Sequence, residues 1–223
     1  IRFKEYDLVM DEEFSIINTN TRNEKIKNFF VKNKNKIISG VIILIVIIAS
    51  VFSYDKYLVN KKKDISNNFN SITIDYSDNT KEKTTSSLIE IINKKDPTYS
   101  PLSLYFIIDN NLVSDQDTVN SFFDILINDT SLESEIKNLI IYKKALYNAD
   151  NAQESELLNM LNPLINSKSV WKSHSLYLMA EYFYANNQKQ KAKEFFNQII
   201  ALENSNLDIR LQAEKRLNRD LSE

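Results

Sequence analysis

The chain has 223 residues with 28 basic and 30 acidic side chains, so its net charge is −2. This balance lacks the basic footprint of a nucleic-acid-binding domain, and no nucleic-acid partner is expected. There is no cysteine, one histidine (His174) and one glycine (Gly40). These counts exclude thiolate metal sites, cysteine nucleophiles, a histidine-rich metal site within one chain and glycine-rich phosphate loops. No cofactor, metal or small-molecule ligand is expected.

Residues 1–36 form a tail that we predict to be cytoplasmic. Its first part is acidic between residues 5 and 13, and its second part is basic and predicts a juxtamembrane helix. The basic side chains are Arg22, Lys25, Lys27, Lys32, Lys34 and Lys36. Residues 28–36 suit either contact with anionic lipid or a solvated flank that only sets the membrane topology.

Residues 37–54 predict a transmembrane helix. The segment contains no charged residue, and its length as a helix is about 27 Å, close to the hydrocarbon thickness of a bilayer. A buried core helix would normally carry a polar stripe, and this segment is apolar on every side. A cleaved signal peptide is the other alternative, but no small-residue cleavage site follows the segment. We interpret it as a single membrane anchor.

The flanking charges predict the orientation of this anchor. Six basic residues lie between 22 and 36, just before the segment, whereas four follow it: Lys56, Lys61, Lys62 and Lys63. Under the positive-inside rule the N-terminus is cytoplasmic and the C-terminal part lies on the outer side. Tyr54 and Tyr57 fit the aromatic belt of the outer interface.

From Asp55 onward the apolar residues recur with helical spacing, so the fold class is all-α. The predicted helices are 55–75, 80–94, 98–111, 116–128, 132–148, 153–166, 169–186, 189–203 and 206–221. We assign residues 55–95 to connecting helices and 96–223 to an α-solenoid of about three degenerate tetratricopeptide-like hairpins with a C-terminal capping helix. Helix starts are predicted by Asp96-Pro97, by a capping box at 130–133 and by a weaker one at 151–154.

An internal repeat supports these hairpins. The clearest unit runs from Ser173 to about Ser205, on the roughly 34-residue tetratricopeptide frame. Asn186 and Asn187 form its turn, because asparagine tolerates the left-handed conformation that glycine usually supplies. An earlier segment matches it: residues 103–105 correspond to 175–177 at an offset of 72, and 122–123 correspond to 195–196 at an offset of 73.

The chain resembles a bacterial family, the YfgM-like ancillary subunits of the Sec translocon. Residues 22–30 resemble the helix that precedes the family's anchor, and a C-terminal set resembles its signature: 157–161, Trp171, Ala180, Asn187, Ala192 and Phe196. The family usually has glycine where this chain has Asn187, and the middle hairpin is eroded. The resemblance implies an inner-membrane protein with a periplasmic domain, associated with the export channel and with periplasmic chaperones.

In such repeats the binding groove is lined by first-helix residues that do not pack internally. His174, Tyr177, Glu181 and Tyr184 share one face of the predicted helix 169–186 and are the candidate groove. The alternative is an ordinary half-exposed face, or packing on the terminal helix. In the membrane segment, Gly40 and Ile43 are candidates for contact with another helix.

The sequence offers two other functions. Asp109, Asp115 and Asp117 are candidate acid–base residues, but capping and solvation at a turn explain them more simply, so we predict no enzyme. The alternative to export is an envelope scaffold for cell division or outer-membrane assembly.

Overall fold

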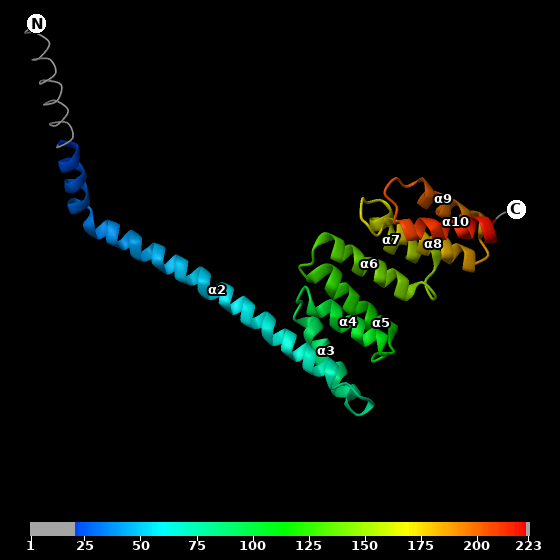
Figure 1. Ribbon diagram of the computed structural model, residues 1–223. Coiled ribbons are helices and arrows are strands. Elements are labelled where there is room, and N and C mark those ends of the chain that lie inside the picture. The colour runs from blue at the N-terminus through cyan, green and yellow to red at the C-terminus, as the bar shows by residue number, and fades with distance from the viewer. Residues whose placement is uncertain (1–20, 222–223) are drawn as a thin grey trace, which may run out of the picture. The chain divides into compact units, whose positions relative to one another are not determined.

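The computed structural model describes residues 21–221, and all of the regular structure in this range is helical (Figure 1). The predicted all-α fold class is therefore confirmed. The chain divides into two compact units, Ile1–Lys61 and Lys62–Glu223. The acidic part of the tail and the last two residues lie outside the described range.

The first unit contains helical residues 21–32, a turn at residue 33 and the first part of α2 (Lys34–Ile74). In the described range, α2 is the one helix that is long and apolar enough to cross a membrane. The apolar residues between Ile38 and Phe52 are solvent-exposed, and the Ser50 hydroxyl donates to the Val46 carbonyl at 2.8 Å. Sequence reasoning placed a separate helix at 55–75, but α2 is continuous because no glycine or proline lies between Gly40 and its end.

In the second unit, the helices lie within about three residues of their predicted bounds. After a short 3₁₀ turn (Asp78–Thr80) come α3 (Lys81–Asn93), α4 (Tyr99–Asp109), α5 (Gln116–Asp124), the π-helical turn η2 (Ile125–Asp129), α6 (Ser134–Asn148), α7 (Glu154–Ile165), α8 (Lys172–Ala185), α9 (Lys189–Ala201) and α10 (Leu207–Asp220).

Two apolar clusters hold this unit together. The first joins α3, α4, α5, η2 and one residue of α6 through Leu88, Ile92, Leu104, Ile107, Val119, Phe122, Phe123, Leu126 and Ile140. The end of α2 also belongs to it, because Phe69 packs against the cluster and the Tyr99 hydroxyl donates to Ser66 Oγ at 2.7 Å. The compact unit thus begins well before residue 96, where sequence reasoning placed the start of the hairpin domain.

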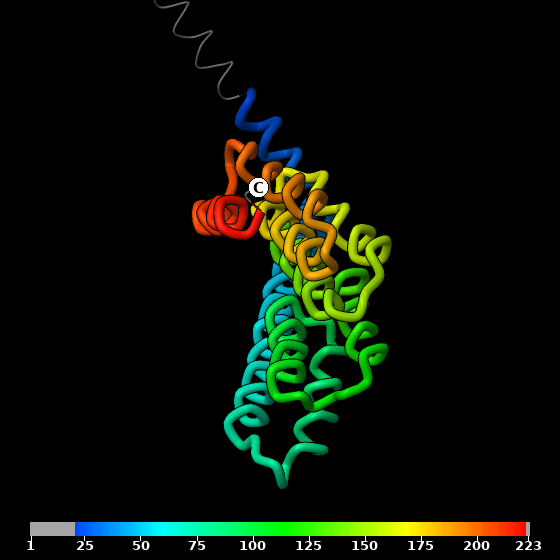
Figure 2. The backbone as a smooth tube through the Cα atoms, turned by 90° about the vertical axis from the view of Figure 1, so that its right-hand side faces the viewer, coloured from blue at the N-terminus to red at the C-terminus, as the bar shows by residue number. Residues whose placement is uncertain are grey.

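The second cluster joins α6 through α10. Its centre is the pair α8 and α9, which lie side by side in Figures 1 and 2. The turn between them confirms the role predicted for Asn187, which has a φ of 61°. The Gln188 amide donates to the Phe183 carbonyl at 2.8 Å, so the left-handed residue closes the end of α8 as glycine commonly does.

The helix starts were predicted less well. Asp96 caps as expected, with Oδ1 accepting from the amides of Thr98 and Tyr99 at 2.9 and 2.8 Å. The capping box at 130–133 was wrong, because the Thr130 hydroxyl donates instead to the Ile125 carbonyl, which the π-helical turn presents to it. The box predicted at 151–154 is shifted by two residues to Gln153 and Glu156.

The internal repeat has a counterpart in burial. Six pairs of positions related by the offset of 72 or 73 are buried in both α4–η2 and α8–α9. The fully or almost fully buried pairs are Ser103 and Ser175, Leu104 and Leu176, Ile107 and Met179, Val119 and Ala192, Phe123 and Phe196, and Leu126 and Ile199. The equivalence extends to the next helix, because Ile140 of α6 and Ala213 of α10 are both fully buried at an offset of 73.

Candidate protein-binding site

The face of α8 that was selected from the sequence is contacted by α10 at Glu181 and Tyr184. Arg216 of α10 donates from Nε and Nη2 to the two Glu181 carboxylate oxygens, both at 2.6 Å. Its guanidinium also lies 4.2 Å from the centre of the Tyr184 ring. Glu181 and Tyr184 therefore pack on the terminal helix, which is the alternative stated for this face in the sequence analysis.

The other two residues of that face are also engaged within the chain. The centres of the Tyr177 and Phe196 rings lie 5.5 Å apart. Burial together with the nearby Glu181 raises the pKa of the Tyr177 hydroxyl to about 12. His174 lies 5.0 Å from the ring of Trp171 and 5.9 Å from that of Tyr142. Burial lowers the pKa of His174, so its imidazole is neutral at pH 7.

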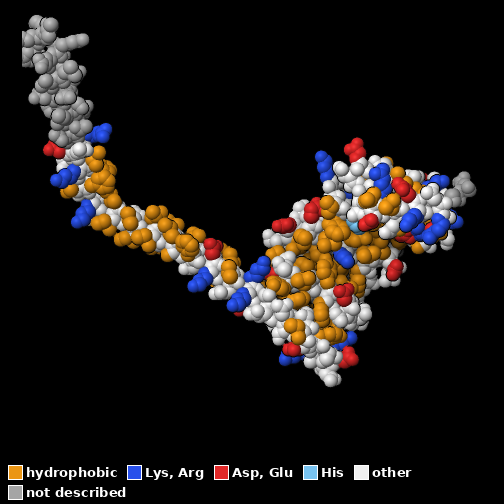
Figure 3. All heavy atoms as spheres, viewed as in Figure 1, with side chains coloured by type: hydrophobic (Ala, Val, Ile, Leu, Met, Phe, Trp, Pro, Cys, Tyr) orange, Lys and Arg blue, Asp and Glu red, His pale blue; other side chains and the backbone are white. Residues whose placement is uncertain are grey.

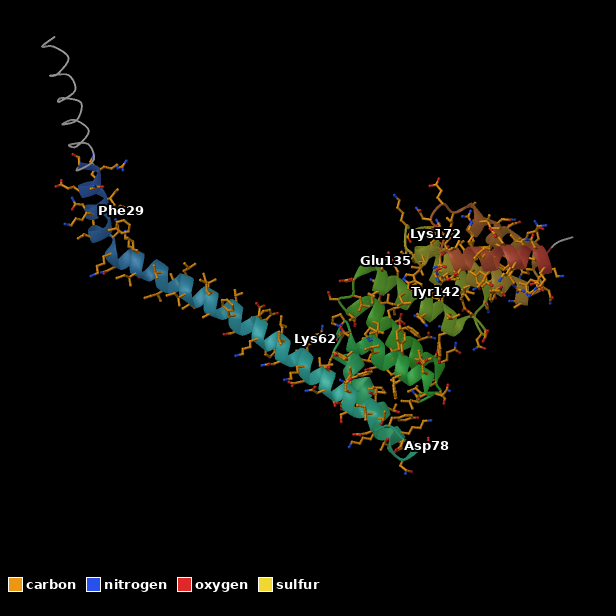
Figure 4. All side chains as sticks on the ribbon, viewed as in Figure 1. Phe29, Lys62, Asp78, Glu135, Tyr142 and Lys172 are labelled. Carbon is orange, nitrogen blue, oxygen red and sulfur yellow. The ribbon has the colours of Figure 1, made fainter. Side chains whose placement is uncertain are left out.

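These contacts link α6 to α8. Trp171 stacks on Tyr142 at 5.7 Å and donates from Nε1 to the Glu135 carbonyl at 3.1 Å. Figure 4 labels Glu135 and Tyr142 on α6 and Lys172 at the start of α8. Trp171 is thus a packing residue between α6 and α8.

An open apolar groove lies instead between α4 and α6. It has a volume of about 590 Å³. Its apolar lining comes from Pro97, Pro101, Leu102 and Tyr105 on one side and from Leu132, Ile136, Leu139 and Ile140 on the other. Leu102 and Ile136 are 42% and 41% exposed, so water covers apolar side chains here. Apolar side chains gather over these helices in the space-filling view (Figure 3).

A second hollow of about 330 Å³ is next to the first, and Tyr105 lines both. It is bounded by Phe123 and by the C-terminal half of α6, where Leu146 is 44% exposed. Lys143 Nζ lies 5.8 Å from the centre of the Tyr105 ring. Burial raises the pKa of Tyr105 to about 12. The two hollows together are called the α4–α6 groove below.

The internal repeat connects this groove with the face chosen from the sequence. Three residues of the α8 face have counterparts 72 positions earlier in the chain. The counterparts of His174, Tyr177 and Glu181 are, in this order, Leu102, Tyr105 and Asp109, and all three line the α4–α6 groove. The offset of 73 carries Arg216 onto Lys143. The face of α8 selected from the sequence is therefore the repeat counterpart of the α4 face that lines this groove, and its binding role stays a prediction. The repeat was the signal that could have identified the open one.

The two copies of the repeat, α4–α5 and α8–α9, differ in how the helix that follows each of them contacts its first helix. That following helix is α6 in the N-terminal copy and α10 in the C-terminal copy. In the C-terminal copy, Arg216 holds Glu181 and also pairs with Asp220, so α10 is fixed against α8. In the N-terminal copy, the matching Asp109 and Lys143 both line the second hollow, and Tyr147 replaces the second carboxylate. The equivalent face between α4 and α6 is consequently open and mostly apolar.

The membrane-contact candidates lie in the first unit. A Cβ built on Gly40 meets no atom within 4 Å, and Ile43 is 60% exposed. Both positions are therefore open for a neighbouring helix, and their contact role remains a prediction.

Comparisons with protein-family models, with curated proteins and with solved structures find no match. The groove must be interpreted from its chemistry. A mostly apolar lining with a few charged residues at its margin binds apolar side chains by removing them from water, and the charges orient the partner.

Proposed function

We propose that this chain is a single-pass membrane protein without enzymatic activity, whose helical domain binds a polypeptide partner in the α4–α6 groove. The N-terminal tail is cytoplasmic and the domain is periplasmic in a bacterial inner membrane. The observation that carries the binding role is the exposure of Leu102, Ile136 and Leu146 along one groove.

The anchor has its own support. Apolar residues on all sides of α2 are exposed, including Ile43 at 60% and Ile45 at 59%, so a solvent other than water must cover them. Hydrocarbon provides that solvent, and a helix satisfies its backbone polar groups internally while crossing it.

The repeat supports an interaction role for the domain. The matched burial of α4–α5 and α8–α9 fits a tetratricopeptide-like solenoid, in which each hairpin buries its core against its neighbours. Such stacking leaves the first helices of successive hairpins along one surface. The α4–α6 groove then lies between the first helices of two neighbouring hairpins.

The resemblance to the YfgM-like subunits gives the finer proposal. Here the span contacts the Sec channel, and the domain links export to periplasmic chaperones. An envelope scaffold for division or outer-membrane assembly would use the same anchor and groove with different partners.

In-cell photocrosslinking tests the proposal directly. A photoreactive amino acid replaces Ile43, Leu102 or Leu146 in the full chain, and Leu207 on α10, which is 68% exposed, serves as the surface control. We expect Ile43 to crosslink to the channel subunit and the two groove positions to crosslink to a periplasmic protein that Leu207 does not capture. Exclusive crosslinks from Ile43 to a division protein would refute the export assignment.

Matched substitutions test the groove itself. Leu102→Ser and Ile136→Ser change exposed side chains, so the fold is retained, and Leu207→Ser is an equally conservative change elsewhere. Both groove variants should lose the periplasmic crosslink from Leu146, while Leu207→Ser keeps it. Equal yields in all three variants would show that the groove is not the binding surface.

A further inference from the structure

The helical residues 21–32, just before α2, have an apolar face that no described residue of their own unit covers. Ile26, Phe29 and Phe30 are spaced i, i+3 and i+4 and therefore share one face. They are 47%, 60% and 55% exposed. Figure 4 labels Phe29 on this helix. An uncovered aromatic and aliphatic face of this kind is typical of a helix that lies on another surface.

Basic residues border this face. At 100° per residue, Lys25 and Lys32 lie along one edge of it and Lys27 lies along the other. The opposite side carries Glu24 and Asn28, with Val31 as its one apolar residue. Long lysine side chains at the edges of an apolar face reach from it toward anionic groups while their stems stay in apolar surroundings.

The chain also places this helix at the membrane surface. The uncharged segment begins at Ile37, only five residues after Lys32, a helical distance of about 7 Å. A turn at residue 33 separates the helix from α2, and the ribbon changes direction there (Figure 1). The Phe29 carbonyl accepts from both the backbone amide and the side-chain amide of Asn33, at 3.0 and 2.9 Å.

We infer that residues 21–32 form an interfacial helix that lies on the anionic headgroups of the leaflet in which α2 begins. Ile26, Phe29 and Phe30 insert at the boundary between headgroups and acyl chains, and Lys25, Lys27 and Lys32 contact lipid phosphates. The occupant of this face is therefore a lipid surface. The inference rests on the proposed anchor, because α2 must cross the bilayer for the helix to be held there.

The absence of cysteine allows a direct test in the full chain. Single spin labels are placed at Ile26→Cys on the apolar face, Asn28→Cys on the opposite face and Ile43→Cys in the span. The chain is reconstituted in vesicles of phosphatidylcholine mixed with anionic phosphatidylglycerol, which gives the vesicles a negative surface. Accessibility to oxygen and to a water-soluble nickel chelate then gives the depth of each label.

We expect the label at 26 to be protected from the chelate and the label at 28 to be accessible, with 43 in hydrocarbon. Equal accessibility at 26 and 28, with 43 still in hydrocarbon, would overturn the interfacial helix and leave the anchor standing. Accessibility of the label at 43 to the chelate would instead overturn the anchor. Equal protection of 26 in pure phosphatidylcholine would overturn the role of anionic lipid.

Charge neutralisation supplies the matched control. Lys25→Gln, Lys27→Gln and Lys32→Gln are combined in one variant, and a second variant carries the same change at 61–63, beyond the span. Each neutralised lysine should lower the ratio of docked to undocked helix about fivefold on the anionic vesicles. The variant at 61–63 should leave the label at 26 protected. The same loss of protection in both variants would overturn the inference.

Discussion

Replacing Arg216 by alanine should loosen α10 from α8 more than any other change of a charged residue on that helix. The side chain is 17% exposed and donates two charge-assisted hydrogen bonds to Glu181, besides its pairing with Asp220 and its contact with the Tyr184 ring. A hydrogen bond to a charged group contributes about 1.5–3 kcal/mol, and Glu181, at 34% exposed, regains part of its hydration when Arg216 is lost. We expect a net cost of about 2 kcal/mol.

Arg219 is the control for this prediction. It pairs with the same Asp220 at 2.7 Å, but its side chain is 73% exposed, so Arg219→Ala should cost only about 0–0.5 kcal/mol. Hydrogen exchange of the α10 amides in the full chain measures the difference. Exchange should accelerate about thirtyfold in Arg216→Ala, from the 2 kcal/mol above, and less than about threefold in Arg219→Ala.

A double-mutant cycle with Glu181→Gln isolates the contact between the two side chains. The interaction energy should be about 1–2 kcal/mol, because the residues bond directly. If Arg216→Ala and Arg219→Ala accelerate exchange equally, or if the cycle gives no interaction energy, the ionic contact does not fix α10 and the reasoning fails.

Three further predictions concern single groups. Asn187→Ala should lower the free energy of unfolding by about 1 kcal/mol while Asn187→Gly does not lower it, because φ is 61° there; thermal unfolding of the two variants decides this. Arg219 and Arg216 hold the pKa of Asp220 at about 2, below the unfolded 3.8, so its contribution is present above pH 4 and is lost as pH falls toward 2. Thermal unfolding against pH should show this loss in the natural chain and not in Asp220→Asn. Burial raises the pKa of Tyr105 to about 12, so the free energy of unfolding falls as pH rises above 10. In a titration followed by absorbance at 295 nm, Tyr105→Phe should show one fewer tyrosine that ionises near pH 12 than the natural chain.

The helical architecture could be predicted because its signals are local. Amphipathic spacing fixed the helices to within about three residues, and the left-handed turn at Asn187 followed from the tolerance of asparagine for that conformation. The Asp96 cap is local as well. The capping box at 130–133 failed because a π-helical turn upstream offers the Thr130 hydroxyl a carbonyl that the local sequence pattern does not reveal.

The open groove could not be predicted from one helix face alone. The pattern on α8 is real, with His174, Tyr177 and Glu181 on one side, but whether such a face is open depends on the helix that lies against it. That helix is α10, and its Arg216 bonds to Glu181, a residue 35 positions earlier in the sequence. The same register on α4 is left open because Lys143 and Asp109 both line a hollow.

The different chemistry of the two faces follows from the position of their third helices. In α10, Ala213 is the one buried residue within the helix, Ile209 and Leu217 are partly buried against the second cluster, and the contact from Arg216 adds a polar attachment. In α6, Ile140, Ala145 and Asn148 are buried, and α5 and α7 pack against it as well as η2. Because α6 is held from these sides and by Ile140 in the core, the exposed part of its face toward α4, where Ile136 is 41% exposed, adds little to stability and can remain apolar and open. Substitutions of the exposed groove residues should therefore change binding far more than they change the free energy of unfolding.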